Sequence, residues 1–244
     1  MQDNASAPQL DPSKFAISSV DALQVNMPPA PVVTEDDIDA QLFVYVASAE
    51  KGSGIHSVAD LDDAWVKSSF DGLDTIAALR EAISRDIGQQ GRRIWDNLKF
   101  QKCSDALAAR FEGEVPEDVV EANAEASRAQ YDQRLMALGT TKARYLRDQQ
   151  MTLEEFDEKL HDDVVFQLKL NGALDKMIEA TGTEVAKSEL TEYLSTDDPD
   201  AFLAQLEETG RVEDARQAAA RVKVMRHLVA TAVVTEVNED ATNV

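Results

Sequence analysis

The chain has 244 residues, of which 43% are hydrophobic and 29% charged, and its formal net charge is −22. A surface this acidic repels phosphate backbones and anionic lipids, so the charge argues against nucleic-acid and membrane-surface binding. Aromatic residues make up only 6%, with 10 glycines and 7 prolines. This composition favours helices over a β-sandwich.

The first 33 residues contain no helical pattern. Residues 1–14 are polar and lack the basic and apolar regions of a signal peptide, so we predict a disordered tail and the cytoplasm as the compartment. Residues 15–33 are predicted to be an extended linker segment. Residues 15–27 are predicted to be one extended strand or a linker, and a polyproline-like turn follows.

The first helix is predicted over residues 34–48. Thr34 is a favourable N-cap, and the acidic first turn suits the positive end of the helix dipole. A glycine-containing loop follows over residues 49–59, with Gly52 and Gly54 breaking the helical pattern.

Residues 60–111 are predicted to be helical with one break near Gly72. Apolar residues recur there at helical spacing, which indicates a long amphipathic helix. Gly88 and Gly91 weaken its middle and favour a bend. The stripe consists of Ile76, Leu79, Ile83, Ile87, Ile94 and Leu98.

The second half of the chain is predicted to be a series of helices. One starts at Pro116 and carries a seam of small residues at Ala122, Ala126 and Ala129. Thr152 and Glu155 have the spacing of a capping box, which starts a helix that ends at Gly182. Further helices are predicted over residues 185–195, from a cap at Asp198-Pro199 to Gly210, and over 212–235, before a frayed tail at 237–244.

Catalytic and metal-binding patterns are absent from the sequence. His56, His161 and His227 stand far apart, and no phosphate-binding loop or nucleophile motif occurs. Cys103 cannot form an intramolecular disulfide and is predicted to be a core residue on a helix. We therefore predict no catalytic residue, no metal and no cofactor. Helices with apolar groups on more than one face favour a protein-binding or peptide-binding role.

Five segments, in this order along the chain, resemble the C-terminal chaperone domain of bacterial trigger factor. The resemblance covers roughly residues 15–234. The segments are "LQVNMPPAPVVTEDDIDAQL", "LDDAWVKSSFDGLDTIAALREAISRDI", "FEGEVPEDVVEANAEA", "LEEFDEKLHDDVVFQLKLNGALDKMIEATGTEVAKSELTEYL" and "DDPDAFLAQLEETGRVEDARQAAARVKVMRHLV".

The resemblance implies an all-α fold: an elongated multi-helix cradle with two arms, similar to trigger factor and SurA, preceded by a short extended segment. The helical chaperone domain would cover residues 34–236, with its body and arms at 60–236. The family's helical domain holds unfolded or nascent polypeptides without ATP. The apolar residues not needed for the main stripes are the candidate client contacts: Phe43, Tyr45, Met136, Leu138, Tyr145, Met151, Phe202 and Met225.

Two departures from the family pattern limit what the resemblance implies. No N-terminal ribosome-binding domain is recognisable, so ribosome docking is not expected. In the family, a prolyl isomerase domain is inserted between the linker helix, which corresponds to residues 34–48, and the helical body, which corresponds to residues from 60 onward. This chain has about eleven residues there, far too few for a domain. Prolyl isomerase activity, and hence enzymatic activity, is therefore expected to be absent.

Three other interpretations stay open at this point. The chain could bind one folded partner as a scaffold, be an exported SurA-like chaperone whose signal was removed, or be an engineered fragment joined by its Gly-Ser-Gly sequence. The oligomeric state is also open, because the net charge opposes self-association whereas an empty apolar groove favours a weak homo-oligomer.

Overall fold

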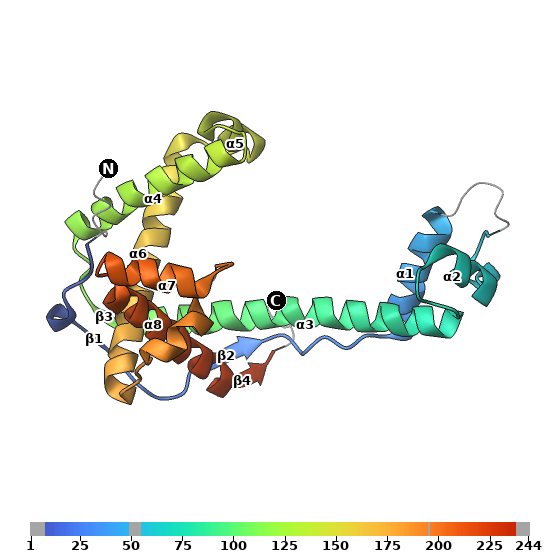
Figure 1. The fold of residues 1–244 in the computed structure, drawn as a ribbon, viewed down its shortest axis with the longest axis horizontal. Helices are drawn as coiled ribbons and strands as arrows, with labels where there is room; N and C mark the ends of the chain where they lie inside the picture. Colours follow the sequence, from blue (N-terminus) through green and yellow to red (C-terminus); the bar gives the residue numbers. More distant parts are fainter. Residues whose placement is uncertain (1–7, 49–54, 195, 238–244) are drawn as a thin grey trace, which may run out of the picture. The chain divides into compact units, whose positions relative to one another are not determined.

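Helices make up most of the computed structural model, which describes residues 8–48, 55–194 and 196–237 (Figure 1). The prediction of an all-α fold is confirmed. The α-helices are α1 (Glu35–Ser48), α2 (Asp63–Ser69), α3 (Ile76–Ala108), α4 (Glu117–Ala137), α5 (Lys142–Asp148), α6 (Leu153–Thr181), α7 (Pro199–Glu208) and α8 (Val212–Thr231). Short 3-10 helices are η1 (Pro12–Lys14), η2 (Val58–Asp60) and η3 (Lys187–Tyr193), and short strands are β1 (Phe15–Ile17), β2 (Gln24–Met27), β3 (Phe111–Gly113) and β4 (Val233–Glu236).

The described residues form two compact units. The α1–α2 unit consists of residues 26–48, 55–101 and 235–237, and the α4–α8 unit of residues 8–25, 102–194 and 196–234. Predicted features at residues 1–7, 49–54 and 238–244 lie outside the described residues. The first two belong to the predicted tail and to the Gly52/Gly54 loop, and the last to the predicted frayed end.

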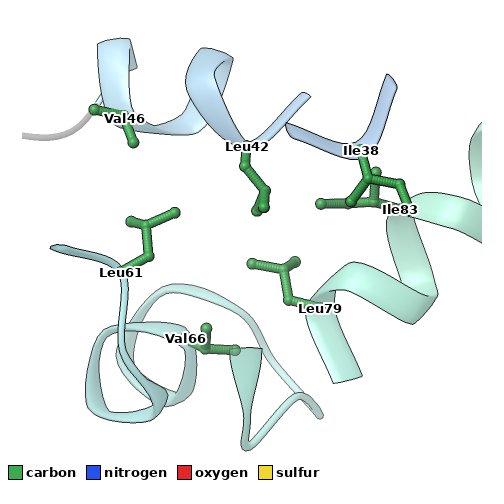
Figure 2. Close-up of a cluster of buried hydrophobic side chains, with 7 residues drawn as sticks. All are labelled: Ile38, Leu42, Val46, Leu61, Val66, Leu79 and Ile83. Carbon is green, nitrogen blue, oxygen red and sulfur yellow. The ribbon is translucent and has the colours of Figure 1, made fainter. Parts of the chain in front are cut away.

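The core of the α1–α2 unit forms where the inner face of α1 meets the chain that follows it (Figure 2). This face carries Ile38, Leu42 and Val46, which are four residues apart and therefore share one side of the helix. They pack against α2 and the first turns of α3. The remaining members of the cluster are Leu61, Val66, Leu79 and Ile83.

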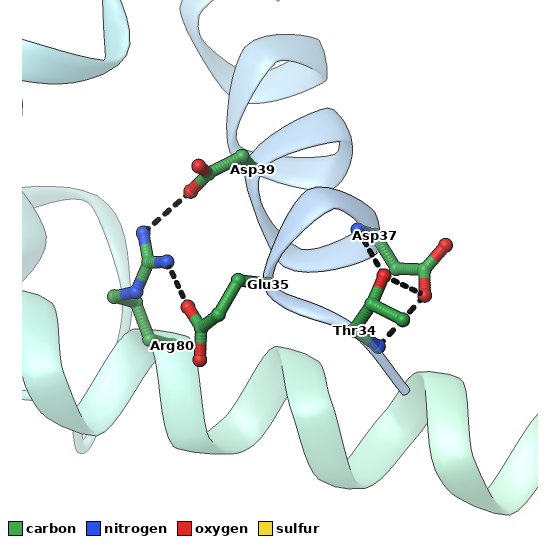
Figure 3. Close-up of polar contacts among 5 residues, drawn as sticks. All are labelled: Thr34, Glu35, Asp37, Asp39 and Arg80. Atoms are coloured by element: carbon green, nitrogen blue, oxygen red, sulfur yellow. Dashed lines mark hydrogen bonds and ion pairs between the residues drawn. The ribbon is translucent and has the colours of Figure 1, made fainter. Parts of the chain in front are cut away.

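Polar contacts fix the start of α1 (Figure 3). The Thr34 hydroxyl accepts a hydrogen bond from the Asp37 amide at 3.3 Å, and the Asp37 carboxylate accepts one from the Thr34 amide at 2.8 Å. The Thr34 hydroxyl also donates to the Asp37 carboxylate at 2.7 Å, and this bond, followed by the one from the Thr34 amide, lowers the pKa of Asp37. The bond from the Asp37 amide to the hydroxyl confirms Thr34 as the N-cap. The guanidinium of Arg80 on α3 donates to both Glu35 and Asp39, and the two carboxylates raise the pKa of Arg80.

The helix α3 is uninterrupted at both glycines where the sequence favoured a bend. A Cβ atom at Gly91 would lie 3.1 Å from the Cβ of Pro31, and one at Gly88 would lie 3.4 Å from a methyl group of Val33. The glycines thus let the extended segment before α1 lie close to the helix. Trp95 holds the same segment by donating its indole N–H to the carbonyl of Pro28 at 3.0 Å.

Of the two alternatives for residues 15–27, one continuous strand is wrong. The chain forms β1 and β2 with a turn between them. The guanidinium of Arg110 explains the turn, because it donates to the carbonyls of Ser19, Asp21 and Ala22 and so holds the chain away from an extended path. The strand β1 pairs antiparallel with β3, and Ile17 lies opposite Phe111.

The long helix α6 is the centre of the α4–α8 unit, since α4, α8 and the β1–β3 pair all contact it. The rings of Phe15 and Phe111 stack with centroids 5.0 Å apart. A Cβ atom at Gly172 of α6 would lie 2.9 Å from the Phe111 ring. The absence of a side chain at Gly172 therefore lets the two rings pack directly on the helix.

The buried face of α4 differs from the predicted alanine seam. Val120 and Ala124 are buried against Val164 and Leu168 of α6, whereas Ala129 is exposed. The predicted seam follows a neighbouring line on the same helix. In a helix with so many alanines, composition alone does not separate two adjacent faces.

Several predicted helix ends are confirmed. The Thr152 hydroxyl accepts from the Glu155 amide at 3.1 Å and the Glu155 carboxylate accepts from the Thr152 amide at 2.7 Å, which makes the capping box. Gly182 ends α6 in the left-handed conformation with φ 61°. Asp198 caps α7 by accepting from the Ala201 amide at 3.0 Å.

Two predicted helices differ from those observed. The helix predicted over residues 185–195 is the 3-10 helix Lys187–Tyr193, and the helix predicted to end at 235 stops at Thr231. Val233, Val234 and Thr235 are β-branched, and such residues favour an extended strand, here β4. Cys103 is fully buried on α3, as predicted.

Candidate functional site

The most distinctive surface in the α4–α8 unit lies at the end of a helical hairpin. Figure 1 shows α4 and the first turns of α6 side by side, with α5 at the end of the pair. We call this end, residues 135–156, the arm tip. It is shaped by two turns whose backbone bonds run from the Thr140 amide to the Leu135 carbonyl and from the Met151 amide to the Leu146 carbonyl, each 2.9 Å.

An aromatic cluster holds the three helices of the arm tip together. The ring centroid of Tyr131 on α4 is 5.5 Å from that of Tyr145 on α5 and 5.1 Å from that of Phe156 on α6. A hydrogen bond with Tyr145, followed by burial, raises the pKa of Tyr131 to about 12. The cluster gives the two turns of the arm tip a packed base.

Large apolar side chains project from this base into solvent. Met136 is 68% exposed, Leu138 73% and Leu153 55%. The packing of the hairpin does not need them, because Leu135, Leu146 and Phe156 are the buried residues of the same segment. Apolar side chains gathered at one end of a helical pair are typical of a surface that contacts another protein.

Four of the predicted client contacts belong to the arm tip. Met136 and Leu138 are largely exposed there, whereas Tyr145 and Met151 are half-buried. Leu153 was missed by the sequence reasoning, although a signal existed. The signal is its position: Leu153 directly follows the N-cap Thr152 and lies outside the buried apolar stripe of α6, whose first residue is Phe156.

Phe202 lies in a different part of the same unit. It is 41% exposed and lines an apolar hollow of about 280 Å³ beside η3 and α8. Tyr193, Leu206 and Val222 line the same hollow. Met225 is only 4% exposed and packs in the core, so it offers no surface to a ligand in this structure.

Phe43 and Tyr45 belong to α1 in the other unit. Phe43 is 64% exposed, because the stripe of Ile38, Leu42 and Val46 occupies the inner side of the helix. Tyr45 is half-buried and meets the ring of Phe70 edge-on at a centroid distance of 5.2 Å. Only Phe43 of this pair presents most of its side chain to solvent.

The charged side chains of the described residues form ion pairs rather than a reactive cluster. The most buried pair joins Arg221 of α8 to Asp175 of α6 through bonds of 2.7 and 2.6 Å. His161 lies 3.5 Å from Glu117 and 3.7 Å from Asp162. No group of three or more metal-ligating side chains converges in the part of the chain that the structure describes.

Among the described helices, none combines the length and the apolarity needed to cross a bilayer.

Comparison with known proteins identifies relatives over much of the chain. The trigger factor of Nocardioides sp. (strain ATCC BAA-499 / JS614) is 29% identical over 185 residues, which cover 72% of this chain and 38% of the relative. The trigger factor of Thermobifida fusca (strain YX) is 26% identical over 145 residues, covering 57% and 31%. That of Corynebacterium glutamicum (strain R) is 26% identical over 188 residues, covering 71% and 39%.

The chain thus spans less than two fifths of the length of each of these relatives. A family model described as "Bacterial trigger factor protein (TF) C-terminus" matches residues 75–230. The match includes all of α3–α7 and nearly all of α8. Because it covers well over half of the sequence, the chain belongs to the family of the bacterial trigger factor C-terminus.

Proposed function

We propose that this protein is an ATP-independent chaperone that holds unfolded or nascent polypeptides on apolar helical surfaces. The observation that carries the proposal is the exposed apolar arm tip of Met136, Leu138 and Leu153 in a chain of the trigger factor C-terminal family. Unfolded chains expose leucine, valine and aromatic side chains, and burying them against the tip releases water from both surfaces.

The chemistry of the arm tip suits clients of many shapes. Methionine and leucine side chains make non-directional contacts, and a thioether adapts to irregular partners. Each contact contributes little, so clients exchange rapidly. Neither a nucleotide nor a metal takes part in such binding.

The proposal includes the absence of prolyl isomerase activity. Helix α1 ends at Ser48 and the next element begins at Val58, which leaves no room between them for a folded domain of ordinary size. We expect the purified protein to leave the cis–trans relaxation of a short proline-containing peptide at its uncatalysed rate. An accelerated relaxation would refute this part of the proposal.

The experiment that tests the holding function replaces Met136, Leu138 and Leu153 together by serine. We expect the variant to lose most of its ability to suppress aggregation of a chemically denatured client after dilution, because the apolar contact area is gone. The readout is light scattering at several ratios of protein to client.

The matched control removes three exposed apolar side chains elsewhere, with Val20→Ser, Val32→Ser and Ile94→Ser. This control should keep the suppression of the unaltered protein. Equal suppression by both triple variants, with helical circular dichroism intact, would show that clients bind somewhere other than the arm tip.

A further inference from the structure

The first described residues of the chain cross the α4–α8 unit as a strap. We define the strap as residues 8–11. Leu10 packs against the buried apolar cluster that α4 and α6 form with Val120, Ala124, Val164 and Leu168. We call the face of α4 and α6 that Leu10 covers, together with the hollow beside it, the groove. The strap therefore covers part of the groove with its own leucine.

One polar contact holds the strap to α4. The side-chain amide of Asn123 donates to the carbonyl of Pro8 at 2.9 Å and to the carbonyl of Val119 at 2.8 Å. The first bond recognises a backbone carbonyl, which every residue of every chain carries. The Asn123 bond therefore does not depend on which side chains the strap carries, whereas the packing of Leu10 does.

The chain directly after the strap is fixed more firmly. Asp11 accepts from the Ser13 amide at 3.0 Å and begins the 3-10 helix η1. Phe15 then enters β1 and is held between Phe111 and α6. Among the described residues, the chain after the strap is thus fixed by several contacts, whereas the strap itself is held by the packing of Leu10 and by the Asn123 bond.

The strap fills the groove incompletely. A hollow of about 250 Å³ remains, lined by strap residues Pro8, Gln9 and Leu10 together with residues of α4, α6 and α8. Well-packed protein interiors leave few voids larger than a water molecule. The polar end of the hollow carries the Asp175–Arg221 ion pair and Gln217. A larger apolar side chain than leucine has room to enter beside these groups.

We propose that the groove between α4 and α6 is a binding site for an extended polypeptide segment with one large apolar side chain, and that the strap is its built-in competitor. The client would place its side chain where Leu10 lies and accept the Asn123 hydrogen bond on a backbone carbonyl. The inference rests on the proposed chaperone function and adds a second site, with its mode of recognition, to the arm tip.

A competitor on the same chain lowers the apparent affinity of the groove in a defined way. Only molecules with the strap released can bind the client, so the apparent dissociation constant rises as the released fraction falls. The groove therefore binds clients weakly while the strap occupies it. A client, or a substitution that weakens the strap's contacts, shifts the equilibrium toward the released strap.

The test uses a fluorescent peptide with the strap sequence SAPQLDPSK and measures its binding to the full chain by anisotropy. In the Leu10→Glu variant the chain's own strap carries a charge that the apolar cluster excludes. We expect this variant to bind the peptide about tenfold more tightly than the unaltered protein. Gln130→Glu is the matched control, because it adds the same charge at an exposed position of α4 that does not line the hollow, and it should leave the affinity unchanged.

A second variant locates the peptide. Adding Asn123→Ala to Leu10→Glu removes the amide that would grip the peptide backbone, so the gain in affinity should largely disappear. Equal peptide binding by the unaltered protein, Leu10→Glu and Leu10→Ser would overturn the proposal, and Leu10→Ser keeps this comparison available if glutamate disturbs the fold.

The peptide assay is independent of the chaperone assay. Loss of aggregation suppression in the arm-tip variant together with unchanged peptide affinity in Leu10→Glu would remove the strap proposal alone. Tighter peptide binding by Leu10→Glu in a protein that suppresses no aggregation would leave the strap in place and remove the proposed function.

Discussion

At the scale of single residues, the glycines have two structural roles: some form turns and helix ends, and one allows a close contact between a helix and two aromatic rings. The break at Gly72 and the helix ends at Gly182 and Gly210 are predictable, because each glycine interrupts a helical pattern and takes a positive φ. Gly172 stands inside a regular helix and looks merely unfavourable. Its role depends on Phe15 and Phe111, which are distant in sequence, so no local pattern identifies it.

The close approach at Gly172 leads to a prediction. In Gly172→Ala the new methyl group would lie 2.9 Å from the Phe111 ring and 3.1 Å from the Phe15 ring, and the stacked rings must shift. We expect the free energy of unfolding in urea to fall by about 1–3 kcal/mol. The matched control is Gly88→Ala, whose methyl group would meet Val33 at an ordinary 3.4 Å.

The control should change stability in the opposite direction. Alanine is favoured over glycine inside a helix by roughly 0.5–1 kcal/mol, so Gly88→Ala is expected to be neutral or slightly stabilising. A loss of stability at Gly88 as large as that at Gly172 would show that helix continuity, rather than ring packing, governs both positions.

At the scale of elements, capped helix starts and helix ends at glycine are better predicted than the end of α8 and the short elements. The caps at Thr34, Thr152 and Asp198 depend on residues three positions apart, so the sequence contains all the information needed. The end of α8 and the 3-10 geometry of residues 187–193 depend on contacts with distant segments. The turn after β1 likewise depends on Arg110, far along the chain.

The capping box of α6 should give this helix start a measurable pH dependence. Hydrogen bonds from the backbone and then the hydroxyl of Thr152 lower the pKa of Glu155 below its usual 4.5. Their contribution to stability is therefore present above pH 4.5 and is lost as the pH falls through the lowered pKa. Nuclear magnetic resonance titration of the Glu155 carboxyl should show this shift directly.

Two substitutions distinguish the contribution of the Thr152 cap from that of the Glu155 charge. Thr152→Ala should raise the pKa of Glu155 toward 4.5 and destabilise the protein to urea by about 1 kcal/mol. Glu155→Gln should keep the box geometry while removing the pH dependence of the α6 start. An unchanged pKa of Glu155 in Thr152→Ala would contradict the assigned bonds.

At the scale of the whole molecule, acidic charge and apolar surface act against each other. The chain has 46 acidic and 24 basic residues, and like charges keep copies apart at neutral pH. The candidate site was predicted in part, because Phe43, Met136 and Leu138 lie outside the apolar stripes and are exposed. Met225 could not be separated from them, since its burial depends on the packing of α8 in the tertiary fold.

This balance leads to a prediction about self-association. The isoelectric point is near pH 4.4, so repulsion between copies vanishes there while the apolar arm tip persists. We expect sedimentation velocity to show growing association as the pH approaches 4.4. The Met136, Leu138 and Leu153 serine triple should associate less than the unaltered protein. The same degree of association in both proteins would assign the effect to charge neutralisation alone.

The division of the chain into two units has a consequence for its synthesis. Almost all of the α1–α2 unit is continuous in sequence, over residues 26–101, whereas the α4–α8 unit combines residues up to 25 with residues 102–234. On a ribosome, the first unit can collapse while the rest is still being made. The strand β1 can pair only after β3 has been synthesised. Pairings between segments so distant in sequence slow folding. A protein proposed to hold incomplete chains thus passes through a stage in which its own first segment is an unpaired apolar strand.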